Sequence, residues 1–148
     1  MNEVYRLIGL VVNNSQVIEH NLAYGLSLHK VVSLFDKRNS VPVAEYNRIE
    51  KEAADIRKKM KEMTLGGVIK LVSETKCFEP KVLDKLEQVL ADRNYVVHQM
   101  IKDRFQPTDQ EVTEMRKYLK ATVEDTNAVN KSLCDRIAAL EKTYDGIE

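Results

Sequence analysis

The carboxy-terminal part of the chain spaces its apolar residues at steps of three or four over about ten helical turns. This spacing runs from Asp109 to about Tyr144 and places the side chains on one face of an α-helix, of the kind found in bundles and coiled coils. Its members are Val112, Met115, Leu119, Val123, Thr126, Val129, Leu133, Ile137, Leu140 and Tyr144, of which Thr126 is polar. Pro107 stops the preceding segment, and Thr108 with Glu111 fits a capping box. We therefore predict a long final helix.

The amino-terminal part predicts a second long helix. It has no proline between Asn2 and about Asp36, and its apolar residues follow the same helical spacing in two neighbouring rows. At 1.5 Å per residue this helix would be about 50 Å long. Because two rows make a wide apolar stripe, we expect the helix to be buried on more than one side, by the bundle core or by a second subunit.

Three shorter helices are expected between the two long ones. A loop over 36–43, marked by Pro42, separates the first helix from a polar helix over 44–63. Thr64 can cap a short helix over 65 to about 75. A further helix begins at Pro80 and is expected to run to about Phe105. Five glycines and three prolines are too few for the turns of an all-β fold. The sequence predicts one all-α domain over residues 1–148, a bundle of about five helices.

The charge balance excludes some classes of protein. Acidic and basic residues number 23 each, which argues against a polybasic nucleic-acid binder but leaves room for a local basic patch. The basic run Arg57, Lys58, Lys59 and Lys61 is interpreted mainly as a solvated helix face, with contact to phosphate as the alternative. No signal peptide and no stretch of about 20 apolar residues is present. We expect a soluble, cytoplasmic protein that makes no membrane contact.

Neither the histidines nor the cysteines predict a metal site. His20 and His29 are expected to be interface or surface residues, and His98 has no cysteine or carboxylate at a spacing typical of a metal ligand. Cys77 and Cys134 are far apart and are expected to be inert, reduced thiols. The prediction is that the protein uses no metal and no other cofactor.

The stretch Arg93-Asn94-Tyr95-Val96-Val97-His98 carries the most chemistry. Asn94 and His98 are four residues apart, so they share a helix face. Arg93 lies about 140° around the helix from His98, but its long side chain can turn toward that face. Histidine exchanges protons near neutral pH, and arginine binds phosphate with a two-pronged fork. These residue types suit general acid–base chemistry on a phosphate ester.

At these positions the chain resembles the HEPN superfamily (higher eukaryotes and prokaryotes nucleotide-binding). The hallmark of that family is an arginine followed, after four to six residues, by a histidine, often with a polar residue directly after the arginine. Arg93, Asn94 and His98 match this pattern, and Met63-Thr64-Leu65-Gly66-Gly67-Val68-Ile69-Lys70 resembles the T-L-G-x-x-I segment that precedes the motif helix in some members. The order of the predicted helices agrees with the family as well.

The resemblance implies a HEPN-like helical bundle, and the function that it implies is cleavage of RNA. Many HEPN proteins are metal-independent ribonucleases that dimerise with two motifs facing one cleft, and many are toxins of toxin–antitoxin or phage-defence systems. It implies catalytic roles for Arg93, Asn94 and His98, cleavage through attack by the ribose 2′-OH, and a 2′,3′-cyclic phosphate product. Lys102 and Arg104 would extend a positive rim for RNA binding. The implied partners are an RNA substrate, a second copy of the chain, and an antitoxin or other partner protein.

One departure and one alternative qualify the implied function. One HEPN branch has a tyrosine two residues after the histidine, which a partner nucleotidyltransferase modifies. This chain has Met100 there, so that form of regulation is not expected. The alternative function is a non-catalytic, dimeric HEPN-like module that binds a nucleotide or a protein.

Overall fold

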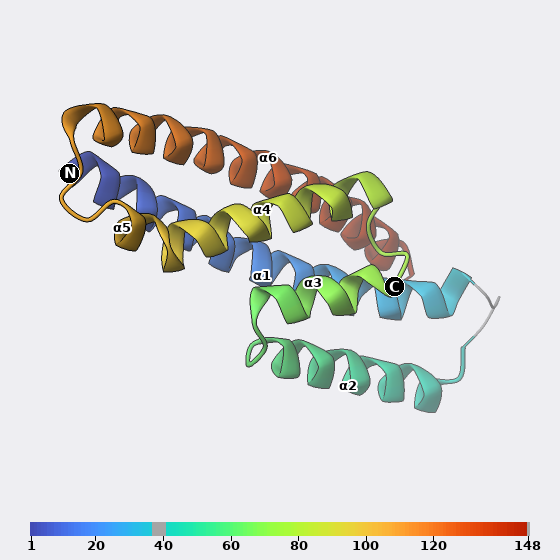
Figure 1. Cartoon of the computed structure of the whole chain (residues 1–148). Helices are drawn as coiled ribbons and strands as arrows, with labels where there is room; N and C mark the ends of the chain where they lie inside the picture. Colours follow the sequence, from blue (N-terminus) through green and yellow to red (C-terminus); the bar gives the residue numbers. More distant parts are fainter. Residues whose placement is uncertain (37–40, 148) are drawn as a thin grey trace.

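The computed structural model describes residues 1–36 and 41–147 of the chain, and every regular element among them is a helix (Figure 1). This confirms the predicted all-α fold with long first and last helices. The helices are α1 (Asn2–Asp36), α2 (Val43–Met60), α3 (Leu65–Ser73), α4 (Pro80–His98), α5 (Met100–Asp103) and α6 (Asp109–Ile147). The described residues thus hold six helices rather than about five, because the segment that follows Pro80 is divided.

Helices α1 and α6 lie side by side and run in the same direction (Figure 1). Polar side chains fix their register. Asn14 Nδ2 donates to Thr126 Oγ1 at 2.9 Å, and Asn130 Nδ2 donates to the Asn14 carbonyl at 3.2 Å. Thr126 is fully buried, so this hydrogen bond satisfies a group that would otherwise cost stability. The one polar member of the α6 face therefore has a partner on α1.

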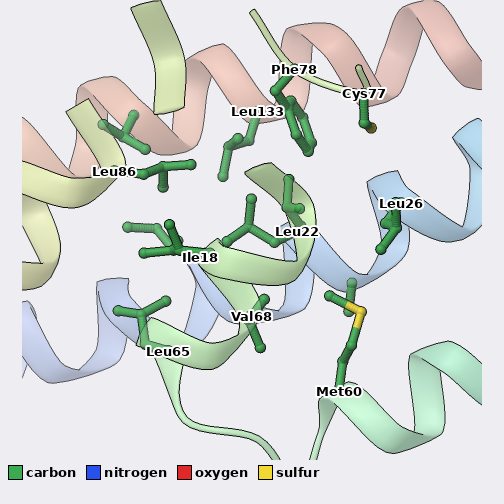
Figure 2. Close-up of a cluster of buried hydrophobic side chains, with 14 of the residues drawn as sticks. Ile18, Leu22, Leu26, Met60, Leu65, Val68, Cys77, Phe78, Leu86 and Leu133 are labelled. Carbon is green, nitrogen blue, oxygen red and sulfur yellow. The ribbon is translucent and has the colours of Figure 1, made fainter. Parts of the chain in front are cut away.

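The principal core lies where α1, α3, α4 and α6 meet (Figure 2). Ile18 and Leu22 of α1 are fully buried and face Val68, Leu86 and Leu133 from the other three helices. A second buried cluster lies toward the amino-terminal end of α1. Its buried members are Val4, Leu7, Val11, Val96, Met100, Met115 and Leu119. Val4, Leu7 and Val11 belong to the first predicted row of the amino-terminal helix, and Met115 and Leu119 to the predicted face of α6, so burial is confirmed for these positions. The second row of the amino-terminal helix is only partly buried, since 42% of the surface of Val17 is exposed.

The predicted helix from Pro80 to about Phe105 is wrong beyond His98. Gln99 has φ −122° and ψ −39°, outside the helical region, and Arg104 ends the four-residue α5 with φ −121° and ψ 41°. Spacing could not show this break, because Val96 and Met100 keep a step of four and are both buried. The break places His98 at the last position of α4.

Three other helix ends differ from the prediction by one to three residues. Helix α2 begins at Val43 and ends at Met60, before a turn over 61–63, and α3 ends at Ser73. The predicted cap of α3 is confirmed, since Thr64 Oγ1 accepts from the Gly67 N–H at 3.1 Å. Residues 37–40 of the predicted loop lie outside the described residues.

The predicted capping box of α6 is confirmed in both directions. The Thr108 N–H donates to Glu111 Oε2 at 2.8 Å, and the Glu111 N–H donates to Thr108 Oγ1 at 3.2 Å. The backbone hydrogen bond from Thr108 contributes most to a pKa of Glu111 below its ordinary value. The carboxylate form therefore stabilises the start of α6 above pH 4.5, and this contribution is lost as the pH falls through the folded pKa.

We expect Thr108→Ala to lower the free energy of unfolding by about 1 kcal/mol, because it removes the acceptor for the Glu111 N–H. Urea unfolding followed by circular dichroism measures this. Thr113→Ala is the matched control: Thr113 is exposed inside α6 and its hydroxyl donates only to the Asp109 carbonyl behind it. We expect no loss there, since alanine is the better helix former. Equal losses in the two variants would contradict the role given to the cap.

Candidate active site

The end of α4 presents Arg93, Asn94 and His98. The helix is anchored by its fully buried Leu86 and Val96, so residues on the other faces reach the surface. Asn94 and His98 are both exposed on the face that their spacing predicts. Arg93 is half-buried, and its Nη1 donates to Asn94 Oδ1 at 3.1 Å. Asn94 therefore links the guanidinium of Arg93 to the face that carries His98.

The guanidinium of Arg93 forms no ion pair within the described part of the chain. Its Nε is buried and has no hydrogen-bond partner. The neighbouring carboxylate of Asp92 is turned to α6 instead, where it accepts from the Tyr118 hydroxyl at 2.7 Å. Arg93 therefore forms an ion pair with neither Asp92 nor Glu87, the acidic residues nearest to it on α4. The guanidinium of Arg93 therefore has N–H donors that can hydrogen-bond to a ligand.

Glu19 of α1 is the acidic group on which the charge of Arg93 acts. Partial burial raises the pKa of Glu19, and the positive charge of Arg93 opposes that rise. The two side chains are therefore close enough to interact electrostatically, although they form no ion pair. The core agrees with this proximity, because Ile18, the residue before Glu19, and Val89, one turn before Arg93, belong to the same buried cluster.

The two residues expected to form a positive rim have different surroundings. Lys102 of α5 is exposed. Arg104 is half-buried and its Nη1 lies 3.3 Å from Glu111 Oε1 and 3.6 Å from Glu114 Oε2. These carboxylates at the start of α6 compete with any phosphate for Arg104. Lys102, by contrast, forms no ion pair with a residue that the structure describes.

A groove between α1 and α2 was not foreseen from the sequence. It has a volume of about 530 Å³ and is lined by Glu19, His20 and Tyr24 from α1 and by Arg57 and Lys61 from α2 and the turn after it. In retrospect, the spacing of four in both the His20–Tyr24 and Arg57–Lys61 pairs is a signal of a shared face. The sequence did not show that these two faces meet.

The remaining reactive side chains do not form a site. Burial raises the pKa of the Cys77 thiol to about 12, so this cysteine is not a nucleophile near neutral pH. Among the residues that the structure describes, no three histidine, cysteine or acidic side chains are grouped so as to hold a metal ion. Within the same residues, no helix has the length and apolarity to cross a membrane.

Comparisons of the chain with protein-family models, with curated proteins and with solved structures gave no match.

Proposed function

We propose that this protein is a metal-independent RNA endonuclease of the HEPN type. The observation that carries the proposal is the arrangement at the end of α4, where the guanidinium of Arg93 contacts Asn94 and pairs with no carboxylate that the structure describes. His98 lies exposed on the same face as Asn94, one turn further along the helix. One end of α4 thus carries a guanidinium group and a proton-transfer group, the two kinds of group that phosphodiester cleavage requires.

In the proposed reaction the ribose 2′-oxygen forms a bond to the adjacent phosphorus and the bond from phosphorus to the 5′-oxygen breaks. His98 accepts the proton of the 2′-OH, and the leaving 5′-oxygen takes up a proton. Arg93 and Asn94 donate to the non-bridging oxygens, on which negative charge builds up in the transition state. The products are a 2′,3′-cyclic phosphate and a free 5′-hydroxyl.

A homodimer is part of this proposal. One chain supplies a single His98, whereas the reaction needs a proton acceptor and a proton donor at once. A second copy that faces the first would supply the other histidine. Val97, directly beside His98, is an apolar side chain with 39% of its surface exposed, and such a residue suits a contact between copies. The proposal extends to a toxin role, in which the protein is harmful when expressed alone and a partner protein relieves the effect.

The test is incubation of the purified protein with single-stranded RNA of mixed sequence in the presence of EDTA. We expect cleavage that leaves 2′,3′-cyclic phosphate ends, detected by their resistance to phosphatase and their loss of that resistance after acid treatment. An RNA with 2′-O-methyl groups throughout should remain intact, because the attacking hydroxyl is blocked. A folded dimer that cleaves no RNA would instead support the non-catalytic binding module.

A further inference from the structure

The groove between α1 and α2 has no residue of the catalytic motif in its lining. Glu19, part of the groove wall, follows Ile18, which lies in the principal core together with Val89, one turn before Arg93 on α4. From there the groove continues along α1 to Tyr24 and across to Lys61. Its volume of about 530 Å³ falls in the range of roughly 300–1,000 Å³ that small-ligand sites occupy.

One wall of the groove carries a pair of aromatic rings. His20 and Tyr24 are stacked, with ring centroids 6.3 Å apart and planes inclined by 15°. His20 is exposed and Tyr24 is half-buried, so the pair has a solvent-facing part and an anchored part. Buried Ala23 and Met60 supply apolar surface beside the rings. A nucleobase can stack on rings of this kind, and all four bases can do so because each has a flat aromatic face.

The opposite wall carries two cations. Arg57 and Lys61 both line the groove, whereas Lys58 and Lys59 of the same basic run are exposed and do not. Neither Arg57 nor Lys61 takes part in an ion pair with a residue that the structure describes. Two of the four residues in the basic run, Arg57 and Lys61, thus line a concave site, although the whole run was predicted mainly as a solvated helix face. An anionic group held there would gain two charge-assisted contacts.

We infer that this groove binds a nucleotide of the RNA strand other than the one that is cut, with its base on the His20–Tyr24 pair and its phosphate between Arg57 and Lys61. This inference rests on the proposed ribonuclease function and adds a substrate subsite to it. A base and a phosphate are the two chemical features that the walls match separately. Glu19 offers a carboxylate acceptor for amino groups on a base edge.

The test measures binding of a fluorescent, single-stranded ten-nucleotide RNA that carries 2′-O-methyl groups and is not cleaved. We expect the double variant Arg57→Gln/Lys61→Gln to raise Kd about tenfold at fixed salt and to make Kd less dependent on salt concentration, because two phosphate-facing cations are removed. His20→Ala should raise Kd about fivefold through loss of stacking surface. Thermal unfolding confirms that each variant is folded.

The matched control is Lys58→Gln/Lys59→Gln, which removes the same charge from the same basic run but outside the groove. We expect less than a twofold change in Kd for this control. Equal weakening by the two double variants would overturn the subsite, since it would show a general charge effect. Binding of adenosine 5′-monophosphate as tight as that of the ten-mer, with the same dependence on Arg57 and Lys61, would overturn the assignment to an RNA strand in favour of a free nucleotide.

Cleavage kinetics separate this inference from the proposed function. The variant for this measurement is Arg57→Gln/Lys61→Gln, which lacks both cations of the groove. On a cleavable ten-mer the same variant should raise KM with little change in kcat. If the wild type cleaves RNA and the groove variants have the same KM as the wild type, the subsite is wrong while the proposed ribonuclease function is retained. Absence of both RNA binding and cleavage in the wild type would overturn both.

Discussion

Replacing His98 by alanine should lower the rate of RNA cleavage by about 10²–10⁴-fold, the usual contribution of a general acid–base group. The same change should alter the free energy of unfolding by less than about 0.5 kcal/mol. His98 is exposed at the last position of α4 and hydrogen-bonds to no described side chain, so its removal breaks no packing. Single-turnover cleavage of a labelled RNA gives the rate, and urea unfolding gives the stability.

This experiment is decisive because the cleavage rate should fall while the free energy of unfolding stays nearly the same. An inactive variant that is also unfolded would say nothing about chemistry, but this side chain is placed where folding does not depend on it. Lys102→Ala is the control, because Lys102 is an exposed neighbour without a proposed part in proton transfer. We expect it to change the rate only a few-fold through weaker RNA binding. Cleavage by His98→Ala at the wild-type rate would remove His98 from the mechanism.

Arg93 calls for a different substitution, because its side chain is half-buried and its Nε lies inside the protein. Arg93→Lys keeps the positive charge but loses the planar fork that matches phosphate oxygens. For that reason Arg93→Lys tests the fork more cleanly than Arg93→Ala, which also leaves a gap in the packing. The contact with Asn94 would be lost in both variants, as the Nη1 donor is absent.

The fold was predictable to the extent that it depends on long amphipathic segments. In α6, each step of three or four from Met115 to Leu140 returned to a buried position, apart from half-buried Val123. A helix of this length repeats its pattern often enough for the face to be unambiguous. The cap at Thr108 was predictable for a related reason, since its partner Glu111 lies only three residues away in the chain.

The candidate site was predictable for the part that lies on one helix. Arg93, Asn94 and His98 are held by α4 alone, so their spacing determines their relative placement. Contacts between separate segments could not be predicted from the spacing of residues along one helix. Arg104 pairs with Glu111 across the turn at Pro107, and the α1–α2 groove depends on how two helices pack. Periodicity describes each helix face but not the face that it meets.

The connection between α3 and α4 shows the same limit within the core. Cys77 and Phe78 lie in a segment without regular structure, so no spacing rule marks them as buried, yet they are 1% and 4% exposed. Arg136 Nε of α6 donates to the Cys77 carbonyl at 2.8 Å and holds this segment against the bundle. Gly25 of α1 makes room for it, because a Cβ there would lie 2.8 Å from Phe78 Cζ.

Phe78→Ala should therefore lower the free energy of unfolding by about 3–5 kcal/mol, the usual cost of emptying a buried phenylalanine site. The ring packs in the principal core with residues of α1 and α6, and Figure 2 shows it beside Leu133. Its backbone is tied to Arg136 through the adjacent Cys77, so the segment cannot easily collapse into the space that the ring leaves. Urea unfolding at constant pH measures the loss.

Phe105→Ala is the matched control for this measurement. Phe105 also lies in a connection between helices, but 80% of its surface is exposed. The same truncation there removes little buried area, and we expect a change below about 0.5 kcal/mol. Similar losses in the two variants would mean that Phe78 is not a core residue. A large loss confined to Phe78→Ala would show that an irregular segment, which no periodicity marks, stabilises the packing of α1 against α6.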